Sequence, residues 1–540
     1  MTAAGTWRVP ALPQLLLVAV LIAVLGYPLL VIVVGSVGVH PDAFARMLFA
    51  PGAGRAWLNT LWVGCLASVL ALGLASGAVA ATTAVPGRLA GAARAGLVLP
   101  LLVPPFASAV GWSQAYGPGG MTDVLFHLPV RQVIGPAGVL LATAAEVMPI
   151  AYLVLAGSTL VSGNRPAVLG ARASGSSRWD AYRRVTLPLT RPAAAAALAL
   201  AFLAAVNNFT VPAVLGSPAG FETLPSRIYN DLNFATTTSA FLDAQVLAAS
   251  LALAALVILL PAARLMGTRA EVTPAVSASG GLRLARRLPL LAVGAYLTVA
   301  VLGPLAGLAL TAVTRAPGLP PTPANWSLVN FDQAVSGARF LPALSNSILL
   351  AMGSASILLG LGLAVAALER RRGGRTISTA LTLGFAVPGS VLAVAFLLAY
   401  GRWFGGSLLI ILLAYVAKLW ALAHRPLSGA IKALPRGFSL AARASGASSS
   451  ATLRTIVVPI LAPALGAAWA LVFLFALHEV TISSLLYGPT SQTLAVLVLN
   501  IQQVGDVGSS AALACALTAL VLVPAGALGL LLRRHVARSA

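Results

Sequence analysis

Long apolar runs separated by short polar and basic stretches fill almost the whole of this 540-residue chain. Apolar runs of about 20 residues with almost no charge are typical of helices that cross a membrane. Strands are not expected, because the runs are rich in Ala and Leu and lack the alternation of polar and apolar residues that a strand shows. The pattern therefore predicts an all-α polytopic membrane protein.

The apolar runs predict about twelve transmembrane helices. The first run begins after Arg8, and its apolar core is too long for a signal peptide, so we expect it to stay in the chain as the first span. The first six spans are expected at 11–37, 58–82, 93–115, 137–161, 191–215 and 243–267. The second six are expected at 286–314, 346–369, 376–400, 405–428, 462–487 and 508–532.

Composition and charge agree with a membrane protein. Of the residues, 59% are hydrophobic and 9% are charged, whereas soluble domains carry about 25% charged residues. The net charge of +22 does not require a nucleic acid, because 26 of the 34 Lys and Arg residues fall on one side of the predicted spans. Basic residues concentrate on the cytoplasmic side of membrane proteins. We therefore expect both termini in the cytoplasm of a bacterium, and basic loops that face anionic lipid of the cytoplasmic membrane.

The two groups of six spans share short polar signals. The matching signals are Asn59-Thr60 with Asn346-Ser347, and Glu222-Thr223-Leu224 with Gln492-Thr493-Leu494. Because six is an even number, both halves enter the membrane in the same direction, and parallel halves of this kind are related by an axis along the membrane normal. We expect two parallel six-helix halves at 1–267 and 286–540, joined by a cytoplasmic linker at 268–285 that is rich in Ser, Gly and Ala.

A basic, polar loop follows the fourth span and recurs after the tenth, at about 162–190 and 432–461. Both copies contain Ala-Arg-Ala-Ser-Gly, and in both the glycine stands 13 residues before a proline. The stretch before the glycine favours a helix, the glycine permits a turn, and the proline punctuates the entry into the next span. We therefore predict a helix–turn–helix on the cytoplasmic face of each half.

These loops resemble the EAA loop of ABC-importer permeases, in which Glu-Ala-Ala and three further residues precede a Gly, and a Pro ends the following stretch. The matching residues are Ala171, Arg172, Gly175, Leu187 and Pro188, and then Ala441, Ala442, Arg443, Gly446, Val458 and Pro459. The chain departs from the family at Leu169 and Leu440, which stand where the family has Glu, so any ionic role of that Glu is absent. The resemblance implies that each loop docks in a cleft on an ATPase subunit and transmits its motion.

The fusion of two such halves in one chain is most similar to the permeases of the ferric-iron, thiamine and phosphonate importers, with the fold of a type I ABC importer permease. The resemblance implies two copies of an ABC ATPase subunit, which bind ATP and Mg²⁺, and an extracytoplasmic substrate-binding protein. The segments 207–216 and 224–233 look most like the ferric-iron branch. Ferric iron is therefore the favoured cargo, with thiamine, phosphonates and polyamines as alternatives.

The chain is predicted to be a transport subunit rather than an enzyme. A phosphate-binding P-loop needs Gly-Lys followed by Ser or Thr, and neither of the two lysines, Lys418 and Lys432, follows a glycine. Five histidines offer no convincing catalytic set, and no spacing of metal ligands is present. We therefore expect no catalytic residues, no metal site and no cofactor in this chain.

Charged residues inside the predicted spans form a second set of candidates, because a charge at the bilayer centre costs about 2.5–3.5 kcal/mol. Glu146 in the fourth span and Lys418 in the tenth occupy nearly the same position of the repeat. One hypothesis is that they pair across the two halves. The alternative is that each makes a separate structural contact with backbone or helix ends.

Two polar pairs lie at one position of the repeat inside the membrane. Asn207 and Asn208 in the fifth span correspond to His478 and Glu479 in the eleventh. Both spans directly follow the repeated loops, and a rise of about 1.5 Å per residue places the four residues near the middle or outer half of the membrane. They are candidates for lining the translocation path or closing its gate, and the alternative is hydrogen bonding between helices.

Taken together, these features predict the transmembrane permease subunit of an ATP-driven ABC importer, which forms the substrate path and is moved by separate ATPases. The alternative is a proton-coupled secondary transporter with two parallel six-span halves, in which Glu146, Lys418 and Glu479 would carry protons. That alternative leaves the duplicated loop unexplained.

Overall fold

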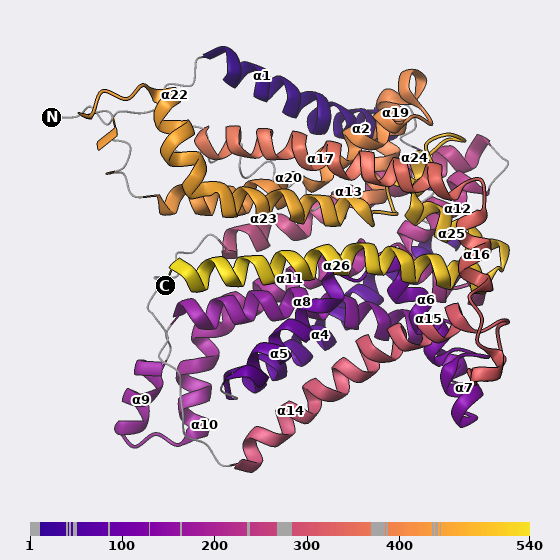
Figure 1. The fold of residues 1–540 in the computed structure, drawn as a ribbon, viewed down its shortest axis with the longest axis horizontal. Coiled ribbons are helices and arrows are strands. Elements are labelled where there is room, and N and C mark those ends of the chain that lie inside the picture. The colour runs from indigo at the N-terminus through magenta and orange to yellow at the C-terminus, as the bar shows by residue number, and fades with distance from the viewer. Residues whose placement is uncertain are drawn as a thin grey trace. The chain divides into compact units, whose positions relative to one another are not determined.

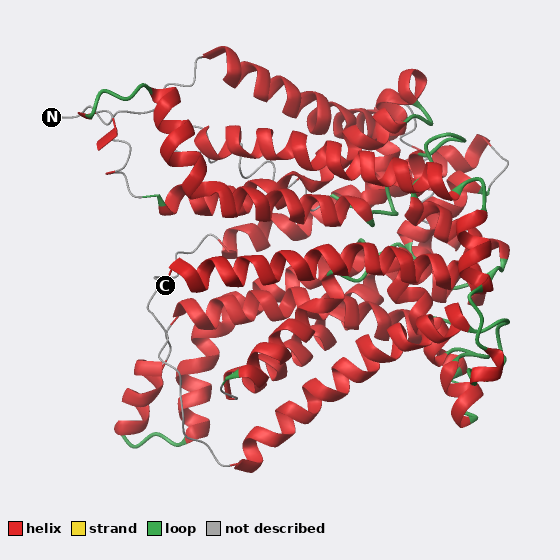
Figure 2. Ribbon diagram, viewed as in Figure 1, coloured by secondary structure: helices red, strands yellow, loops and turns green. Residues whose placement is uncertain are grey.

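A computed structural model describes the chain from residue 11 to residue 539, with short gaps. The gaps are 39–41, 43–44, 47–50, 85–86, 129, 163–164, 235–237, 267–282, 369–383, 385–386, 435–436, 438–440 and 443. Within the described residues the chain consists of helices and loops, and no strand forms between the gaps (Figure 2). The predicted all-α polytopic fold is therefore confirmed.

Ten of the described helices are long and apolar enough to cross a membrane, against about twelve expected. They are Leu16–Ser36, Gly52–Thr83, Pro136–Ser158, Trp179–Val206, Ala240–Ile258, Leu290–Val313, Phe340–Ala366, Leu408–Ala433, Arg454–Leu477 and Val507–Ala527. The predicted third span is instead a pair of helices, Arg88–Leu101 and Pro105–Phe126, bent by 101°. Prolines 104 and 105 explain the break, because proline removes a backbone donor and disfavours helix in the residue before it. The described part of the predicted ninth span is the shorter helix Gly389–Phe404.

The described chain divides into two compact units, and their composition differs from the two halves of the sequence. One unit contains Asp42–Gly337 and Val498–Ala519. Its helices include α4 (Pro51–Ala84), α5 (Arg88–Val98), α6 (Pro105–Tyr116), α8 (Pro136–Ser162), α11 (Leu187–Val206), α12 (Leu224–Asn233), α13 (Thr238–Met266), α14 (Arg283–Leu297) and α15 (Gly303–Val313). In this unit α14 packs against α4, and α15 packs against α6 (Figure 1). The first span of the second half therefore belongs to the unit built from the first half.

The other unit contains Met1–Pro41, Ala338–Leu497 and Leu520–Ala540. Its helices include α1 (Ala11–Leu21), α2 (Tyr27–Gly38), α17 (Phe340–Leu368), α19 (Gly389–Phe404), α20 (Leu408–Ala433) and α23 (Val458–Leu477). Here α17, α20 and α23 pack on one another, and α2 packs against α19. The last helix, α26 (Val507–Ser539), begins in one unit and ends in the other. The two units thus exchange their first spans.

A matching tyrosine holds each exchanged span. The Tyr116 hydroxyl donates to the Val299 carbonyl oxygen at 2.7 Å, and the Tyr400 hydroxyl donates to the Ala23 carbonyl oxygen at 2.6 Å. Both acceptors are the second residue of a π-helical turn, Thr298–Leu302 and Ile22–Gly26 respectively. A π turn shifts the helical hydrogen bonds by one residue, so its carbonyls can accept from a side chain. Both tyrosines are the twelfth residue of their helices, α6 and α19, so the contact is built twice.

Two glycines allow the close approach of α6 and α15. A Cβ added to Gly111 would lie 2.6 Å from the Pro304 carbonyl oxygen, and one added to Gly307 would lie 2.6 Å from the Ala115 backbone nitrogen. Such distances are shorter than real Cβ atoms show, so a larger residue at either position would separate the two helices. This packing fixes the bent third span against the first span of the other half.

Candidate functional site

The first repeated loop forms a helix, a glycine turn and a second short helix. Helix α9 (Arg165–Ala173) contains Ala171 and Arg172, and it ends before Gly175, whose φ angle is +86°. The Gly175 amide donates to the Arg172 carbonyl oxygen and the Ser176 amide donates to the Ala171 carbonyl oxygen, both at 3.1 Å. This pair of hydrogen bonds is the Schellman motif, which needs a left-handed residue after the helix. Glycine is required here because it alone adopts that conformation at no steric cost.

A short helix follows the turn and leads into the membrane. Helix α10 (Arg178–Ala181) begins after Ser177, whose hydroxyl oxygen accepts from the Asp180 amide at 3.0 Å. A serine in this place satisfies an amide that the helix itself cannot pair. Pro188 then stands at the second position of α11, where a missing amide costs nothing. Pro188 thus marks the start of α11 within the continuous helical stretch Trp179–Val206.

The second loop repeats this geometry in the part that the structure describes. Gly446 has a φ angle of +78°, and the Ala447 amide donates to the Ala442 carbonyl oxygen at 3.0 Å. Helix α22 (Ser449–Thr452) begins after Ser448, whose hydroxyl oxygen accepts from the Ala451 amide at 3.2 Å. Pro459 is the second residue of α23. Leu440 and Arg443 lie outside the described residues.

The first loop exposes large apolar side chains among its basic residues. Trp179 is 67% exposed and Leu169 is 53% exposed, while Arg172 is also exposed. Leu169 is the residue that stands in place of the family Glu. An exposed tryptophan in a polar loop is a typical anchor for a protein partner, because aromatic residues dominate the energy of such interfaces. Sequence reasoning identified this loop, but it did not single out Trp179.

The fifth and eleventh spans both break where the polar pairs lie. Helix α11 ends at Val206, directly before Asn207, and α23 ends at Leu477, directly before His478. Asn207 is partly exposed, whereas His478 is 6% exposed and packs its ring 5.4 Å from that of Phe475. The His478 Nδ1 atom has no hydrogen-bond partner in the described structure. Sequence patterns placed both breaks inside continuous spans, because the apolar residues continue beyond them.

The residue after each break position caps the segment that follows. The Asn208 side-chain oxygen accepts from the Val211 amide at 3.1 Å, and the Glu479 carboxylate accepts from the Ile482 amide at 3.0 Å. The segments that follow are the π-helical turn Pro212–Gly216 and helix α24 (Ser483–Leu486). Irregular backbone at membrane depth occurs only where protein or a water-filled cavity surrounds it. Both breaks are therefore features of the protein interior.

The two charged residues of the fourth and tenth spans have local partners. Glu146 accepts a hydrogen bond from the Asn208 side-chain nitrogen at 2.8 Å. The Lys418 ammonium group donates to the Val387 carbonyl oxygen at 2.6 Å. Both side chains are partly exposed. Glu146 and Lys418 belong to different units, so their pairing across the halves stays a prediction.

The matching polar signals near the ends of the spans contact one another within each unit. The Asn59 side-chain nitrogen donates to the Glu222 carbonyl oxygen, and the Thr60 hydroxyl oxygen accepts from the Leu224 amide, both at 2.8 Å. The second half has the same contacts. They join Asn346 to the Thr490 and Gln492 carbonyls at 2.9 Å, and Ser347 to the Leu494 amide at 2.8 Å. We call these contacts the outer clamp. Both signals can be recognised in the sequence, but only the structure shows that they contact one another.

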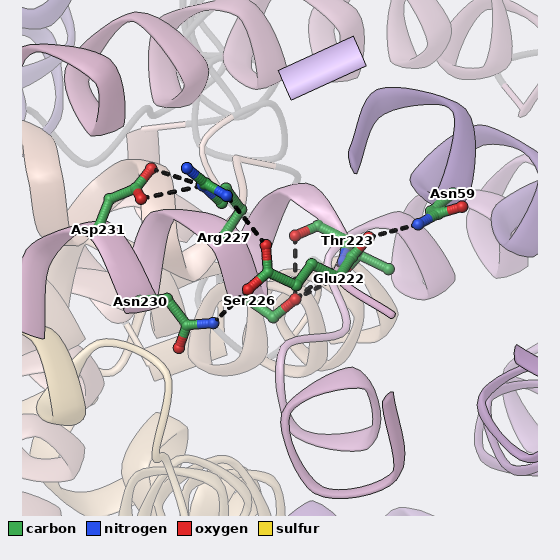
Figure 3. A network of polar contacts seen from close by, with 7 residues as sticks. All are labelled: Asn59, Glu222, Thr223, Ser226, Arg227, Asn230 and Asp231. Carbon is green, nitrogen blue, oxygen red and sulfur yellow. Dashed lines mark hydrogen bonds and ion pairs between the residues drawn. The ribbon is translucent and has the colours of Figure 1, made fainter. Parts of the chain in front are cut away.

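The outer clamp of the first half adjoins a charged network (Figure 3). Arg227 forms ion pairs with Glu222 at 3.3 Å and with Asp231 at 2.9 Å, and the Asn230 side chain donates to the Glu222 carboxylate at 2.7 Å. Burial raises the pKa of Asp231 above its ordinary value, although the Arg227 charge opposes this shift. The equivalent residues of the second half include Gln492, Leu497 and Ile501, so the network is specific to the first half.

Metal ligands do not gather anywhere in the described part of the chain. Within it, no group of three or more His, Cys, Asp or Glu side chains is arranged to hold a metal ion. Carboxylates and histidines are common ligands in such sites, and three of the described carboxylates have other partners: Glu146 binds Asn208, Glu479 binds the Ile482 amide, and Asp231 binds Arg227.

Comparison with known proteins gives a consistent match. A family model described as "Binding-protein-dependent transport system inner membrane component" matches residues 8–267 and 356–539. The probable ABC transporter permease protein y4fN of Sinorhizobium fredii is 26% identical over 487 residues, which cover 85% of this chain and 84% of that protein. The putative ferric transport system permease protein FbpB 1 of Haemophilus influenzae is 26% identical over 497 residues, covering 86% of this chain and 76% of the relative. The putative 2-aminoethylphosphonate transport system permease protein PhnV of Salmonella typhimurium is 26% identical over 207 residues, which cover 37% of this chain and 78% of that protein.

Proposed function

Because the chain belongs to the family of binding-protein-dependent transport system inner membrane components, we propose that it imports ferric iron and is driven by two ATPase subunits docked on its repeated loops. Membership makes it the permease subunit of an ABC importer, a multi-pass membrane protein without catalytic activity of its own. The alternative of a proton-coupled secondary transporter is therefore set aside. A binding-protein-dependent system also has an ATPase and a substrate-binding protein as partners.

The observation that carries the coupling role is the duplicated turn. Gly175 and Gly446 have nearly the same left-handed conformation, each follows a short helical segment, and each precedes a capped helix that leads into a span. Two helix–turn–helix loops of the same geometry in one chain can bind two copies of the same partner. We place one ATPase subunit on each loop, with the exposed Trp179 as an anchor on the first. ATP and Mg²⁺ are bound by those subunits.

The orientation of the chain follows from this placement. The loops at 162–190 and 432–461 face the cytoplasm with both termini, as the distribution of Lys and Arg favours. The outer clamps then lie on the opposite side, where the substrate-binding protein docks. We keep the division into halves at 1–267 and 286–540 for the repeat itself. The linker proposed at 268–285 falls mainly on residues outside the described part.

The substrate path is proposed to run past the two breaks. Asn207, Asn208, His478 and Glu479 lie at or beside them, and two of these side chains are partly exposed inside apolar spans. Polar residues at membrane depth are expensive and usually face a path or one another. Alanine at all four positions should change transport and basal ATP hydrolysis, and unchanged values for both would remove these residues from the path.

Ferric iron is the proposed cargo because relatives described as ferric transport permeases match most of the chain. The described residues offer no metal cluster, so we assign selection of the ion to the substrate-binding protein. Reconstitution tests the cargo directly. Proteoliposomes that hold this chain with its ATPase should take up iron from a ferric-loaded binding protein in an ATP-dependent manner. Uptake of a phosphonate, thiamine or a polyamine instead of iron would overturn the assignment.

A second experiment tests the coupling role without reference to the cargo. The exposed Trp179 is replaced by Ala, with Trp326 as the matched control, because it is 53% exposed and lies outside both loops. Trp179→Ala should weaken binding of the ATPase by more than about tenfold, the effect expected for an aromatic anchor, and Trp326→Ala should leave it unchanged. Equal binding by both variants would argue against docking on this loop.

A further inference from the structure

The fourth and tenth spans carry opposite charges at the same position of the repeat. Glu146 is the eleventh residue of α8, and Lys418 is the eleventh residue of α20. The second residue of the neighbouring break also differs, being Asn208 in the first half and Glu479 in the second. The first half thus has an acid, Glu146, on the long helix and an amide, Asn208, at the break. The second half has a base, Lys418, on the long helix and an acid, Glu479, at the break. Each half therefore keeps one acid, on the long helix in the first half and at the break in the second.

Both breaks use that second position in the same way. Asn208 accepts from the amide of Val211, and Glu479 accepts from the amide of Ile482, each three residues further along the chain. The side chain therefore binds the amide of the residue directly before the following segment and closes the turn that leads into it. An aspartate or glutamate oxygen and an asparagine oxygen serve equally as acceptors, so the cap survives the exchange of Asn for Glu.

The capped break is held against the long helix in each half. In the first half the remaining nitrogen of Asn208 donates to Glu146. In the second half two residues of α20 make the corresponding contacts: Lys418 donates to the carbonyl oxygen of Val387 at 2.6 Å, and the Tyr415 hydroxyl donates to the carbonyl oxygen of Glu479 at 3.1 Å. Val387 stands two residues before α19. These two contacts hold the long helix, the break and the start of the ninth span together.

We propose that residues 146 and 208, and likewise residues 418 and 479, form one positioning device built twice, which we call the break clasp. The clasp fixes the second segment of a broken span against the neighbouring long helix. It acts within one half and needs no ion pair between Glu146 and Lys418. The proposal rests on the proposed function only in that the breaks lie on the substrate path.

An exchange of the clasps between halves tests this proposal. In the single variant Glu146→Lys, the side-chain nitrogen of Asn208 loses its acceptor and lies next to a second donor. Transport should fall by about tenfold or more, because a charge without a partner in the membrane is costly. Adding Asn208→Glu recreates the pair of the second half. We expect the Val103 carbonyl to accept from the new lysine, because Val103 stands two residues before α6 as Val387 stands two residues before α19. Transport should return to within about twofold of the wild type.

The competing ion pair predicts a different rescue. If Glu146 and Lys418 paired across the halves, Lys418→Glu should restore transport to Glu146→Lys, and Asn208→Glu should not. Rescue by Lys418→Glu alone overturns the clasp. A failure of both rescues, in complexes that assemble with the ATPase in normal yield, overturns it as well, and so does unchanged transport in the single variant.

A measurement without cargo separates the clasp from the proposed function. In the assembled complex, hydrogen exchange of residues 207–216 is compared for Glu146→Gln, which keeps an acceptor for Asn208, and Glu146→Leu, which removes it. Exchange should rise by about tenfold in the leucine variant, because a buried donor without a partner is costly, and it should stay unchanged in the glutamine variant. Equal exchange in the two variants overturns the clasp. A failure of iron uptake by the wild type would instead count against the proposed cargo alone.

Discussion

Replacing the glycine of a repeated turn should uncouple ATP hydrolysis from transport while leaving the membrane helices intact. A Cβ at Gly175 would meet no atom within 4 Å, so the cost of Gly175→Ala comes from the backbone alone. The left-handed conformation at φ +86° costs a residue with a Cβ about 1–2 kcal/mol, which changes a population by a factor of about 5–30. The variant loop should therefore relax to another turn and misplace α9 relative to α10.

The assay is ATP hydrolysis by the purified complex, measured with and without the loaded binding protein. Gly175→Ala and Gly446→Ala should each reduce the stimulation several-fold, in keeping with a cost of about 1–2 kcal/mol. Gly175→Asn should reduce it less, since asparagine tolerates this conformation. Gly170→Ala is the matched control, because Gly170 lies in α9 and its Cβ would also meet open space. Normal stimulation in Gly175→Ala, or an equal loss in Gly170→Ala, would refute the reasoning.

Five further variants test the helix packing within the two units. Tyr400→Phe and Tyr116→Phe remove the hydrogen bonds from the hydroxyls to the exchanged spans. Each variant should lower the free energy of unfolding of the purified chain by about 0.6–1.7 kcal/mol, measured by thermal unfolding. An unchanged midpoint for both would show that the hydroxyls contribute nothing. Asn346→Ala and Asn59→Ala should each destabilise the chain, by about 1–3 kcal/mol for each buried group left unpaired, because Asn346 donates to two carbonyls, and Asn59 donates to one carbonyl and accepts from the Trp62 indole nitrogen. An unchanged midpoint for both variants would contradict the outer clamp. Gly307→Ala should cost about 1–3 kcal/mol by separating α15 from α6, and a neutral result in the same assay would show that the helices can move apart freely.

The sequence was sufficient for the class and for the loops. Long uncharged runs can only be satisfied as helices in a membrane, and the equal spacing of Gly175 to Pro188 and of Gly446 to Pro459 is a local property of the chain. The structure gives the turns their left-handed glycines and the following helices their serine caps. Such short-range features depend on neighbours in the chain, so they can be read from it.

The long-range features could not be read in the same way. The first span of each half packs in the other unit, and nothing in the hydrophobicity of the spans distinguishes one apolar partner from another. The breaks at Asn207 and His478 were hidden because apolar residues continue after them. When the two halves are aligned on the repeated loops, Lys418 falls one position away from the equivalent of Glu146. In the structure, both residues are the eleventh residue of their helices, α8 and α20. The spacing between the long helix and the loop differs between the halves, so an alignment on the loops alone misses this match.

The central claim is that the repeated loops are the surfaces on which an external ATPase acts. A single cysteine at Ser174→Cys, an exposed position of the first loop that leaves Trp179 in place, with Cys65→Ser and Cys515→Ser to remove the native thiols, allows chemical cross-linking in the assembled complex. The account predicts a cross-link from this position to the ATPase subunit, at a yield that changes when ATP is bound and hydrolysed. A cysteine at this position that reacts with a water-soluble thiol reagent equally well in the presence and absence of the ATPase, and forms no cross-link to it, would contradict the account.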